Sequence, residues 1–396
     1  MQAWPIKSSA EHAAALARVS SSLSHAISAF AGGALPHTIL SCCQGTLLDM
    51  LNTATVLPLR ATCRDAAAAV AAHPWDDLGT VIRGNLGPTL LPQEPMAPLA
   101  HGDMGPALSP DEDGSTTSCV QMGAWRACFP RARGACVKQS FGRRTPVEDG
   151  DFAHLAGLKR LNMCGCSAVT DAAFVHLSGI QWLNMSMCSQ AAITDAAFAH
   201  LAGIKDLVMK HCSQATITDA AFAHLKGICS LDISYCSQAA ITDAAFVPLA
   251  GIRSLRMAGC AQATITDAAF SHLKGIQSLV MSKCTQETIT DAAFTHLAGI
   301  QRLDMSACNQ ATITDAAFPP LRGIQSLTMS LCDQGTITDA AFECLRGIHS
   351  LDMAGCDQAS ITAAAFVHLL GAQSLNMVGC RRDSILAARA VGLPVR

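Results

Sequence analysis

Nine cysteines stand at one fixed spacing, and such a column of thiols could hold a metal or carry out redox chemistry. The period is 24 residues, and the members are Cys188, Cys212, Cys236, Cys260, Cys284, Cys308, Cys332, Cys356 and Cys380. If the repeats stack in parallel, successive sulfur atoms lie about 5 Å apart. Buried cysteine, however, usually behaves as a small hydrophobic group. We therefore predict structural thiols that bond to loop carbonyl groups, and no metal site.

Seven histidines form a second column, each two residues after a recurring phenylalanine. They are His154, His176, His200, His224, His272, His296 and His368. A zinc ion needs several ligands within about 2 Å, whereas neighbouring units on the helical side of a stack lie about 8–10 Å apart. Pro248, Pro320 and Cys344 also interrupt the column. A solvated face explains these histidines better than a metal site.

A third cluster contains six basic residues and no acidic residue. It consists of Arg126, Arg131, Arg133, Lys138, Arg143 and Arg144. Such a cluster could bind phosphate or nucleic acid, but we favour a solvated face beside an acidic segment. The sequence shows no nucleophile–base constellation, phosphate-binding loop or paired carboxylates in a plausible pocket. We therefore expect no catalytic residue, no cofactor, no enzymatic activity and no nucleic-acid partner.

Composition narrows the classes of protein further. The chain has 396 residues, of which 50% are hydrophobic, and its formal net charge is −3. This charge predicts no general attraction to nucleic acid or anionic lipid. No apolar run approaches the roughly 20 residues of a membrane-spanning helix, so no membrane association is expected. The 19 cysteines are odd in number and ten share one repeat position, which argues against a disulfide framework and favours the cytoplasm or nucleus.

One repeat unit contains a short strand followed by a short helix. The spacing Ile204-x-x-Leu207-x-Met209-x-x-Cys212 predicts a strand with Leu207 and Met209 facing inward. Thr218 is a good helix N-cap, and the charge of Asp219 suits the first turn of the helix. A short unit at a fixed period is typical of a stacked solenoid.

The recurring apolar residues and glycines define the helix ends. Ile217 before the cap and Phe222 inside the helix predict a hydrophobic staple. Gly227 is expected to end the helix in a left-handed cap, with Ile228 packing back on the last turn. A helix of two turns is not stable alone in water, so each helix must depend on its neighbours.

The unit resembles the cysteine-containing class of leucine-rich repeats. The matching motifs are L-x-L-x-x-C, here Leu207 to Cys212, and the helix start Ile217-Thr218-Asp219. The resemblance implies an α/β leucine-rich-repeat solenoid, with a curved parallel sheet and short outer helices, over residues 151–380 in ten units. Val137 lies 24 residues before Leu161, so residues 121–150 are interpreted as an N-terminal capping repeat. Residues 381–396 are interpreted as the C-terminal cap.

The region before the array has two parts after an N-terminal helical or disordered segment at residues 1–34. Residues 80–120 are rich in proline and end near Asp111-Glu112-Asp113, which predicts a disordered linker. Residues 35–79 have a helical pattern that resembles a degenerate F-box. The resemblance is carried by Leu47, Leu48, Leu51, Leu57, Cys63, Arg64, Pro74 and Trp75. It implies a small helical module in which these residues dock onto a Skp-type adaptor of cullin–RING ubiquitin ligases.

The outward strand positions are the candidate binding site. Buried positions barely change between repeats, whereas outward ones include Arg160, Trp182, Asp206, Lys210, His211, Tyr235, Arg256, Lys283, Arg302 and Asp304. Trp, Tyr and Arg dominate the binding energy of protein interfaces. From Ser254 onward the face is mostly serine, threonine and alanine, so a protein partner should bind the N-terminal half. The alternative interpretation is drift at unconstrained positions after tandem duplication.

These observations lead to two hypotheses about function. In the first, the chain is the substrate receptor of a cullin–RING ubiquitin ligase and binds its substrate on the concave repeat face. In the second, it is a non-enzymatic leucine-rich-repeat scaffold or recognition protein with no link to a ligase.

Overall fold

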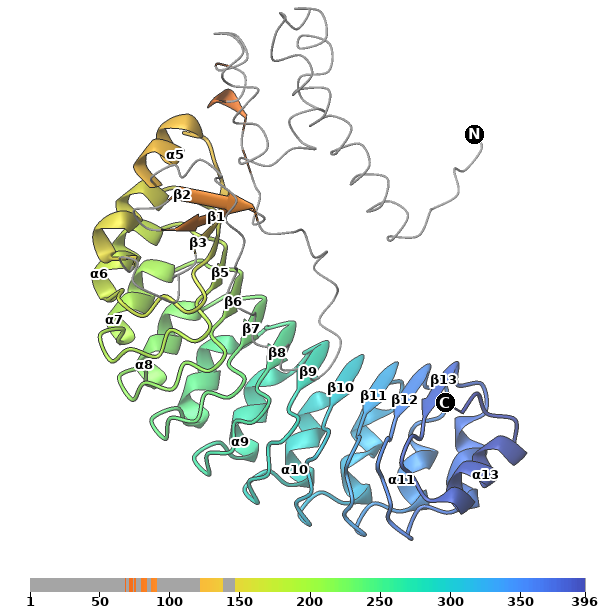
Figure 1. Cartoon of the computed structure of the whole chain (residues 1–396). Coiled ribbons are helices and arrows are strands. Elements are labelled where there is room, and N and C mark those ends of the chain that lie inside the picture. Colours follow the sequence, from red (N-terminus) through yellow and green to blue (C-terminus); the bar gives the residue numbers. More distant parts are fainter. Residues whose placement is uncertain are drawn as a thin grey trace, which may run out of the picture. The chain divides into compact units, whose positions relative to one another are not determined.

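The computed structural model describes residues 68, 71–73, 75, 80–83, 87–90, 122–137 and 147–395 (Figure 1). These residues fall into two compact units. Unit 1 contains the described residues up to Val147 together with Arg160–Asn162. Unit 2 contains Glu148–Lys159 and the chain from Met163 onward.

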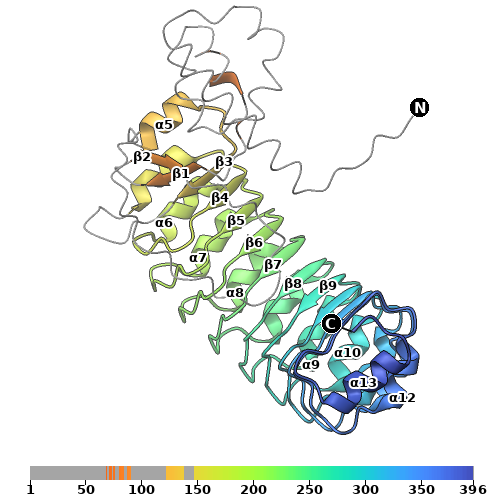
Figure 2. The same cartoon turned by 45° about the vertical axis from the view of Figure 1, so that its right-hand side comes forward.

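Unit 2 contains a sheet of short parallel strands, one from each repeat. They are β5 (Trp182–Asn184), β6 (Asp206–Val208), β7 (Ser230–Asp232), β8 (Ser254–Arg256), β9 (Ser278–Val280), β10 (Arg302–Asp304), β11 (Ser326–Thr328), β12 (Ser350–Asp352) and β13 (Ser374–Asn376). The register places equivalent residues opposite each other, as in Leu207 opposite Leu231. Within unit 2 the strands line the inner side of a curved stack (Figures 1 and 2). The predicted leucine-rich-repeat solenoid is therefore confirmed.

The outer layer consists of short helical segments of about two turns, as expected, in which an α-helical turn is followed in most repeats by a 3₁₀ turn. The α-helices are α6 (Asp171–Phe174), α7 (Asp195–Phe198), α8 (Asp219–Phe222), α9 (Asp267–Phe270), α10 (Asp291–Phe294), α11 (Asp339–Glu343) and α12 (Ala363–Phe366). In α8 a 3₁₀ turn at Ala223–Leu225 follows directly, and Gly227 ends the segment with a φ of 81°. Where Pro248 occurs, the whole segment Asp243–Leu249 is a 3₁₀ helix, because proline lacks an N–H group for the α-helical hydrogen bond.

The core of unit 2 is built from identical columns of apolar side chains. In one repeat Leu207, Met209, Ile217 and Phe222 are each at most 1% exposed, as the strand and helix patterns predict. Burying a side chain of this size contributes about 1.5–3 kcal/mol. Because each helix has only one α-turn, this packing stabilises it rather than its own hydrogen bonds.

The thiols of the cysteine column, called the cysteine ladder from here on, donate hydrogen bonds to the repeat before them. The Sγ atom of Cys212 lies 3.1 Å from the carbonyl oxygen of Met185, and Cys236 donates to Met209 over 3.0 Å. The same bond recurs as far as Cys380, whose partner is the carbonyl of Met353. Burial raises the pKa of the Cys236 thiol to about 12. These thiols are therefore neutral hydrogen-bond donors at physiological pH.

An aspartate at the start of each helix also bonds to the neighbouring repeat. Asp219 accepts from the backbone N–H of Thr242 at 2.7 Å and from its hydroxyl at 2.6 Å. The Thr242 hydroxyl in turn accepts from the N–H of Ala244 at 3.2 Å. The same arrangement runs from the Asp149–Thr170 pair to the Asp339–Thr362 pair. Asp219 was expected to act on its own helix, but the bonds place its carboxylate between two repeats.

The C-terminal end of unit 2 shows where this pattern stops. Ala363 replaces the aspartate at the start of α12. The next α-helix along the chain is α13 (Arg382–Ala390), and no side chain caps its N-terminus. Ala388 of α13 is buried, and Val395 forms an isolated parallel bridge with Leu375. The aspartate is therefore absent in the repeat whose C-terminal neighbour has no threonine cap for it to bond.

Unit 1 corrects two of the sequence predictions. It contains β1 (Thr80–Arg83), β2 (Gly87–Leu90), α5 (Met122–Cys128), β3 (Gly134–Val137) and β4 (Arg160–Asn162). The predicted disordered linker is wrong for β1 and β2, which pair with each other, while β1 also pairs in parallel with β3. The predicted capping register is wrong by two residues, because Ala135 rather than Val137 lies opposite Leu161. Both Ala135 and Val137 are buried, so the shift keeps the same face inward.

Trp75 belongs to the core of unit 1. Its side chain is 1% exposed, and its ring packs edge-on against Phe129 with the centroids 5.7 Å apart. Its carbonyl oxygen accepts hydrogen bonds from the N–H groups of Arg133 and Gly134. A direct contact with an adaptor needs an exposed side chain, so the predicted adaptor-binding role of Trp75 is corrected to a structural one.

The aspartate ladder leads to a stability prediction. We expect Asp219→Ala to lower the free energy of opening around Thr242 by about 1.5–3 kcal/mol, because a charge-assisted pair of hydrogen bonds is lost. Hydrogen exchange of residues 239–249 measures this quantity. Ala363→Asp is the matched control, since no threonine cap follows it, and it should give no stabilisation. Unchanged exchange in Asp219→Ala would contradict the role of the ladder.

Candidate binding face

The inner side of unit 2 presents outward side chains in two strand rows and one turn row. The first strand row includes Trp182, Asp206 and Arg302, and the second, two residues later, includes Asn184, Asp232, Arg256 and Asp304. The turn row contains the residue before Cys166 and the residue before each of the nine cysteines from Cys188 to Cys380. It consists of Gly165, Met187, His211, Tyr235, Gly259, Lys283, Ala307, Leu331, Gly355 and Gly379.

Most of the predicted binding residues lie in these three rows; Lys210 and Arg160 do not. Trp182 lies opposite Asp206 in the register of β5 and β6, and Lys210 precedes the turn-row residue His211. Arg160 lies in β4 of unit 1. Asp304 is 8% exposed, and its carboxylate accepts from the N–H and hydroxyl of Ser306 at 3.0 and 2.6 Å. The prediction that Asp304 contacts a partner is therefore wrong, since its carboxylate supports the turn.

The turn row has a left-handed backbone in every repeat from Gly165 to Gly379. Six of its members are not glycine, and their φ angles are 60° at Met187, 56° at His211, 60° at Tyr235, 59° at Lys283, 54° at Ala307 and 58° at Leu331. A residue with a Cβ atom costs about 1–2 kcal/mol in this conformation. Sequence reasoning missed this feature, although glycines spaced at multiples of 24 residues in the same column were a signal for it.

The hydrogen bonds of the backbone impose this conformation. The N–H of Tyr235 donates to the carbonyl of Ala258 in the next repeat at 2.7 Å, and the N–H of Leu331 donates to Ala354 at 2.8 Å. The N–H groups of the turn row from Gly165 to Gly355 are therefore already bonded to the next repeat. A partner at this row must contact side chains, because these backbone donors are not free to pair with an added strand.

The side chains of the turn row form one compact cluster. The rings of His211 and Tyr235 stack with centroids 4.7 Å apart and planes 3° from parallel. The Nζ atom of Lys283 lies 6.0 Å from the centroid of the Tyr235 ring. A Cβ atom at Gly259 would come within 2.6 Å of that ring. Gly259 is therefore required because Tyr235 lies over it, and the cluster spans four successive repeats.

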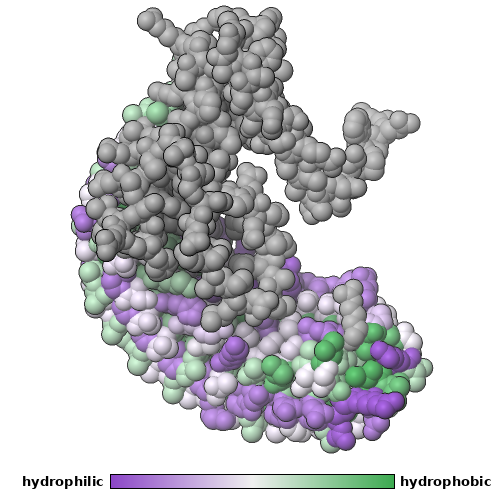
Figure 3. Space-filling view, in the orientation of Figure 1, coloured by the Kyte–Doolittle hydropathy of each residue, from purple (hydrophilic) through white to green (hydrophobic). Residues whose placement is uncertain are grey.

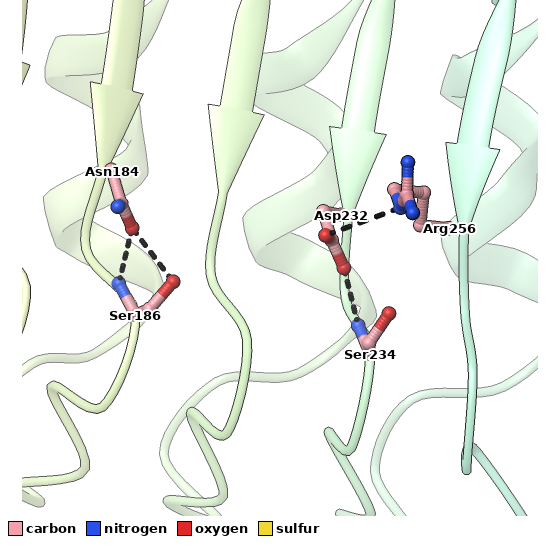
Figure 4. A network of polar contacts seen from close by, with 5 residues as sticks. All are labelled: Asn184, Ser186, Asp232, Ser234 and Arg256. Atoms are coloured by element: carbon pink, nitrogen blue, oxygen red, sulfur yellow. Dashed lines mark hydrogen bonds and ion pairs between the residues drawn. The ribbon is translucent and has the colours of Figure 1, made fainter. Parts of the chain in front are cut away.

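Polar side chains of the second strand row form hydrogen bonds to the turns that follow their strands (Figure 4). The amide oxygen of Asn184 accepts from the N–H and hydroxyl of Ser186 at 3.0 and 2.7 Å. Asp232 accepts from the N–H of Ser234 at 3.0 Å, and Arg256 Nε lies 3.7 Å from the other carboxylate oxygen. These short side chains hold the strand ends in place, so the turn row is presented from a rigid base.

The other candidate clusters have structural partners or lie outside the described residues. Among the residues the structure covers, no group of three histidine, cysteine or acidic side chains could hold a metal ion. In unit 1, Arg126 donates to the carbonyl of Ala132 and Arg131 donates to that of Ala72. Three residues of the basic cluster fall outside the described ranges, namely Lys138, Arg143 and Arg144. So do seven of the eight predicted adaptor-binding residues, namely Leu47, Leu48, Leu51, Leu57, Cys63, Arg64 and Pro74.

Comparison with known proteins supports a leucine-rich repeat region. Residues 239–371 match the BspA type leucine rich repeat region in six copies. The Toll–Spatzle complex, a molecular hub in Drosophila development and innate immunity, is similar in structure at 12% identity with a TM-score of 0.51. The TLR13–ssRNA13 complex is similar at 21% identity with a TM-score of 0.53. No curated protein matches the sequence.

These similarities show the fold alone. Each of the two solved structures aligns with 63% of this chain, and the alignment covers 36% of the other chain. The cysteine-containing class of repeat and the F-box resemblance stay predictions. In the described part of the chain, no helix combines the length and apolar character needed to cross a bilayer.

The left-handed turn row makes a prediction about stability. We expect Ala307→Gly to stabilise the protein by about 1 kcal/mol, because glycine adopts a positive φ without a steric cost. Ala244→Gly, an exposed position in a 3₁₀ helix, is the control and should destabilise by about 0.5–1 kcal/mol. Thermal unfolding of the two variants measures the difference. Destabilisation of equal size in both would contradict the strain in the turn row.

Proposed function

We propose that this protein is a non-catalytic recognition protein that binds a protein partner with the N-terminal half of the inner side of unit 2. The observation that carries the proposal is the cluster of His211, Tyr235 and Lys283 on left-handed turns. Leucine-rich-repeat proteins are typically binding scaffolds without enzymatic activity. The curved stack of unit 2 offers the extended surface that such proteins use.

The backbone conformation argues against drift as the origin of this cluster. Glycine occupies the same turn position at Gly165, Gly259, Gly355 and Gly379, where it carries no steric cost. A substitution away from glycine at positive φ destabilises the fold. Drift at a neutral position does not accumulate such substitutions without consequence. The presence of histidine, tyrosine and lysine in three strained turns within four successive repeats therefore supports a role for the side chains.

The chemistry of the N-terminal half suits a protein interface. Trp182 is half-buried at the start of β5, and Tyr235 is 37% exposed above the stacked histidine. Rigid aromatic side chains of this kind commonly supply most of the binding energy at an interface. The strand positions after Ser254 are dominated by small polar side chains, which offer fewer such anchors.

The ubiquitin-ligase link is the finer part of the proposal. It is supported by the leucines at 47, 48, 51 and 57 and by the Cys63-Arg64 pair, followed by leucine-rich repeats. In this form, residues 35–79 bind a Skp-type adaptor while the repeats select a substrate. A location in the cytoplasm or nucleus fits this role. It also fits the cysteine ladder, whose thiols form no disulfide bonds. The alternative is a recognition or scaffold protein with no ligase link.

The partner site is tested with a double substitution. We expect Trp182→Ala with Tyr235→Ala to weaken binding of the protein partner at least a hundredfold, about 3 kcal/mol, because both aromatic anchors are lost. Affinity is measured by calorimetry with a partner identified by the native chain and then purified. Val175→Ala with Val247→Ala, both on the helical side, is the control and should change nothing. Unchanged affinity in the aromatic variant would move the site away from the inner face.

The adaptor link is tested by co-purification with a Skp-type adaptor. Leu47→Asp with Leu48→Asp should abolish capture of the adaptor, because charged residues cannot fill an apolar docking surface. This pair leaves Trp75, a buried residue of unit 1, in place. Ala68→Asp, at an exposed position, is the control and should retain capture. No capture by the native chain would contradict the ligase link and leave the scaffold alternative.

A further inference from the structure

Three carboxylates of the second strand row of unit 2 are bonded within the fold. The carboxylate of Asp232 is bonded to Ser234 and paired with Arg256, and Asp304 is bonded to Ser306. Asp352 accepts from the hydroxyl of Ser330 at 2.6 Å and from the amide of Asn376 at 3.0 Å. These carboxylates therefore support turns and strand ends and present little negative charge to a partner.

Positive charges on the same side reach the surface. Lys283 and Arg302 are exposed, and Lys210 is half-buried next to His211. The ammonium group of Lys283 lies beside the Tyr235 ring, and a cation held over an aromatic ring remains available to an anion. The turn row from His211 to Lys283 therefore presents a positive and aromatic surface, although the whole chain carries a net charge of −3.

The turn row changes character toward the C-terminal end. Leu331 is 59% exposed, and Val378, which precedes Gly379, is 65% exposed. A Cβ atom at Gly355 would come within 2.6 Å of the Leu331 side chain, so Leu331 lies flat along the row. Apolar surface gathers on the C-terminal part of unit 2 in the space-filling view (Figure 3). One row thus has a positive, aromatic end and an apolar end.

The spacing of the repeats sets the length of what the row can hold. His211 and Gly379 are separated by seven steps of 24 residues, which at about 4.8 Å per strand correspond to about 34 Å. An extended peptide of about ten residues has this length. The N–H groups of the row from His211 to Gly355 are bonded internally, so along this stretch the peptide must be recognised through its side chains.

We infer that the turn row binds an extended segment of a protein partner, about ten residues long, with acidic side chains at one end and apolar side chains at the other. The acidic end lies over Lys210, His211 and Lys283, and the apolar end lies over Leu331 and Val378. The inference rests on the proposed function: it specifies the chemistry of the partner and extends the contact from the N-terminal half of the turn row to its C-terminal end. A nucleic acid fits less well, because its phosphates would need positive charge along the whole row.

Selection from a displayed library of random twelve-residue peptides on the full chain tests this inference without assuming a partner. We expect the enriched peptides to contain at least three acidic residues at one end and an apolar cluster at the other. For a synthetic peptide of that consensus, Lys210→Glu with Lys283→Glu should weaken binding at least tenfold. Leu331→Ser with Val378→Ser should do the same. Lys226→Glu with Lys274→Glu, at exposed positions after the outer 3₁₀ turns, is the charge-matched control and should change affinity less than twofold.

The outcomes separate the inference from the proposed function. Enriched peptides that depend on Trp182 and Tyr235 but are neutral or basic would overturn the inference and leave the proposed function standing. Enrichment that depends on neither the aromatic residues nor the lysines would contradict both. A single-stranded oligonucleotide that binds through the same two lysines, while no acidic peptide is enriched, would also overturn the inference.

Discussion

Each repeat of this chain contains buried polar groups that only a neighbouring repeat can satisfy. The Cys212 thiol donates to Met185 of the previous repeat, and Asp219 accepts two hydrogen bonds from Thr242 of the next. An unsatisfied buried polar group costs about 1–3 kcal/mol, so a repeat removed from its neighbours would lose more than its apolar contacts. The 24-residue register from Cys188 onward fits this dependence. The preceding unit is two residues shorter, and it keeps the same bonds between Asp149 and Thr170 and between Cys188 and Met163.

The same dependence explains why the inner surface carries strained residues. The N–H of each turn-row residue must reach a carbonyl of the next repeat, as Tyr235 reaches Ala258, and this geometry requires a positive φ. Repeats with glycine meet the requirement without a steric cost, whereas those with Tyr235 or Leu331 meet it with strain. Because the ladders hold the fold, the surface side chains can vary while the backbone keeps its conformation. A rigid stack with a variable row suits recognition better than catalysis.

Most of the fold could be predicted from the sequence, because its main signals are local. Leu207, Met209 and Phe222 follow strand and helix spacing, and Thr218 caps its helix as expected. The role of Asp219 could not be read locally, since its partner is 23 residues away in the next repeat. The positive φ of Tyr235 could not be predicted from that residue, because glycine is the residue type that normally indicates a positive φ in a sequence. Asp304 was predicted to be exposed because strand alternation points its side chain outward. Its bond to Ser306 depends on the turn after the strand, which alternation does not describe. The register of β3 failed because the capping unit has lost the 24-residue spacing.

The central claim is that the turn row in the N-terminal half of unit 2 contacts a protein partner. Hydroxyl-radical footprinting, with and without the purified partner, tests it directly because the method reports side-chain exposure. We expect Met187, His211 and Tyr235 to be protected on binding, and Val175 and Val247 on the helical side to be unchanged. Protection of Val175 and Val247 with no change at Tyr235 would contradict it.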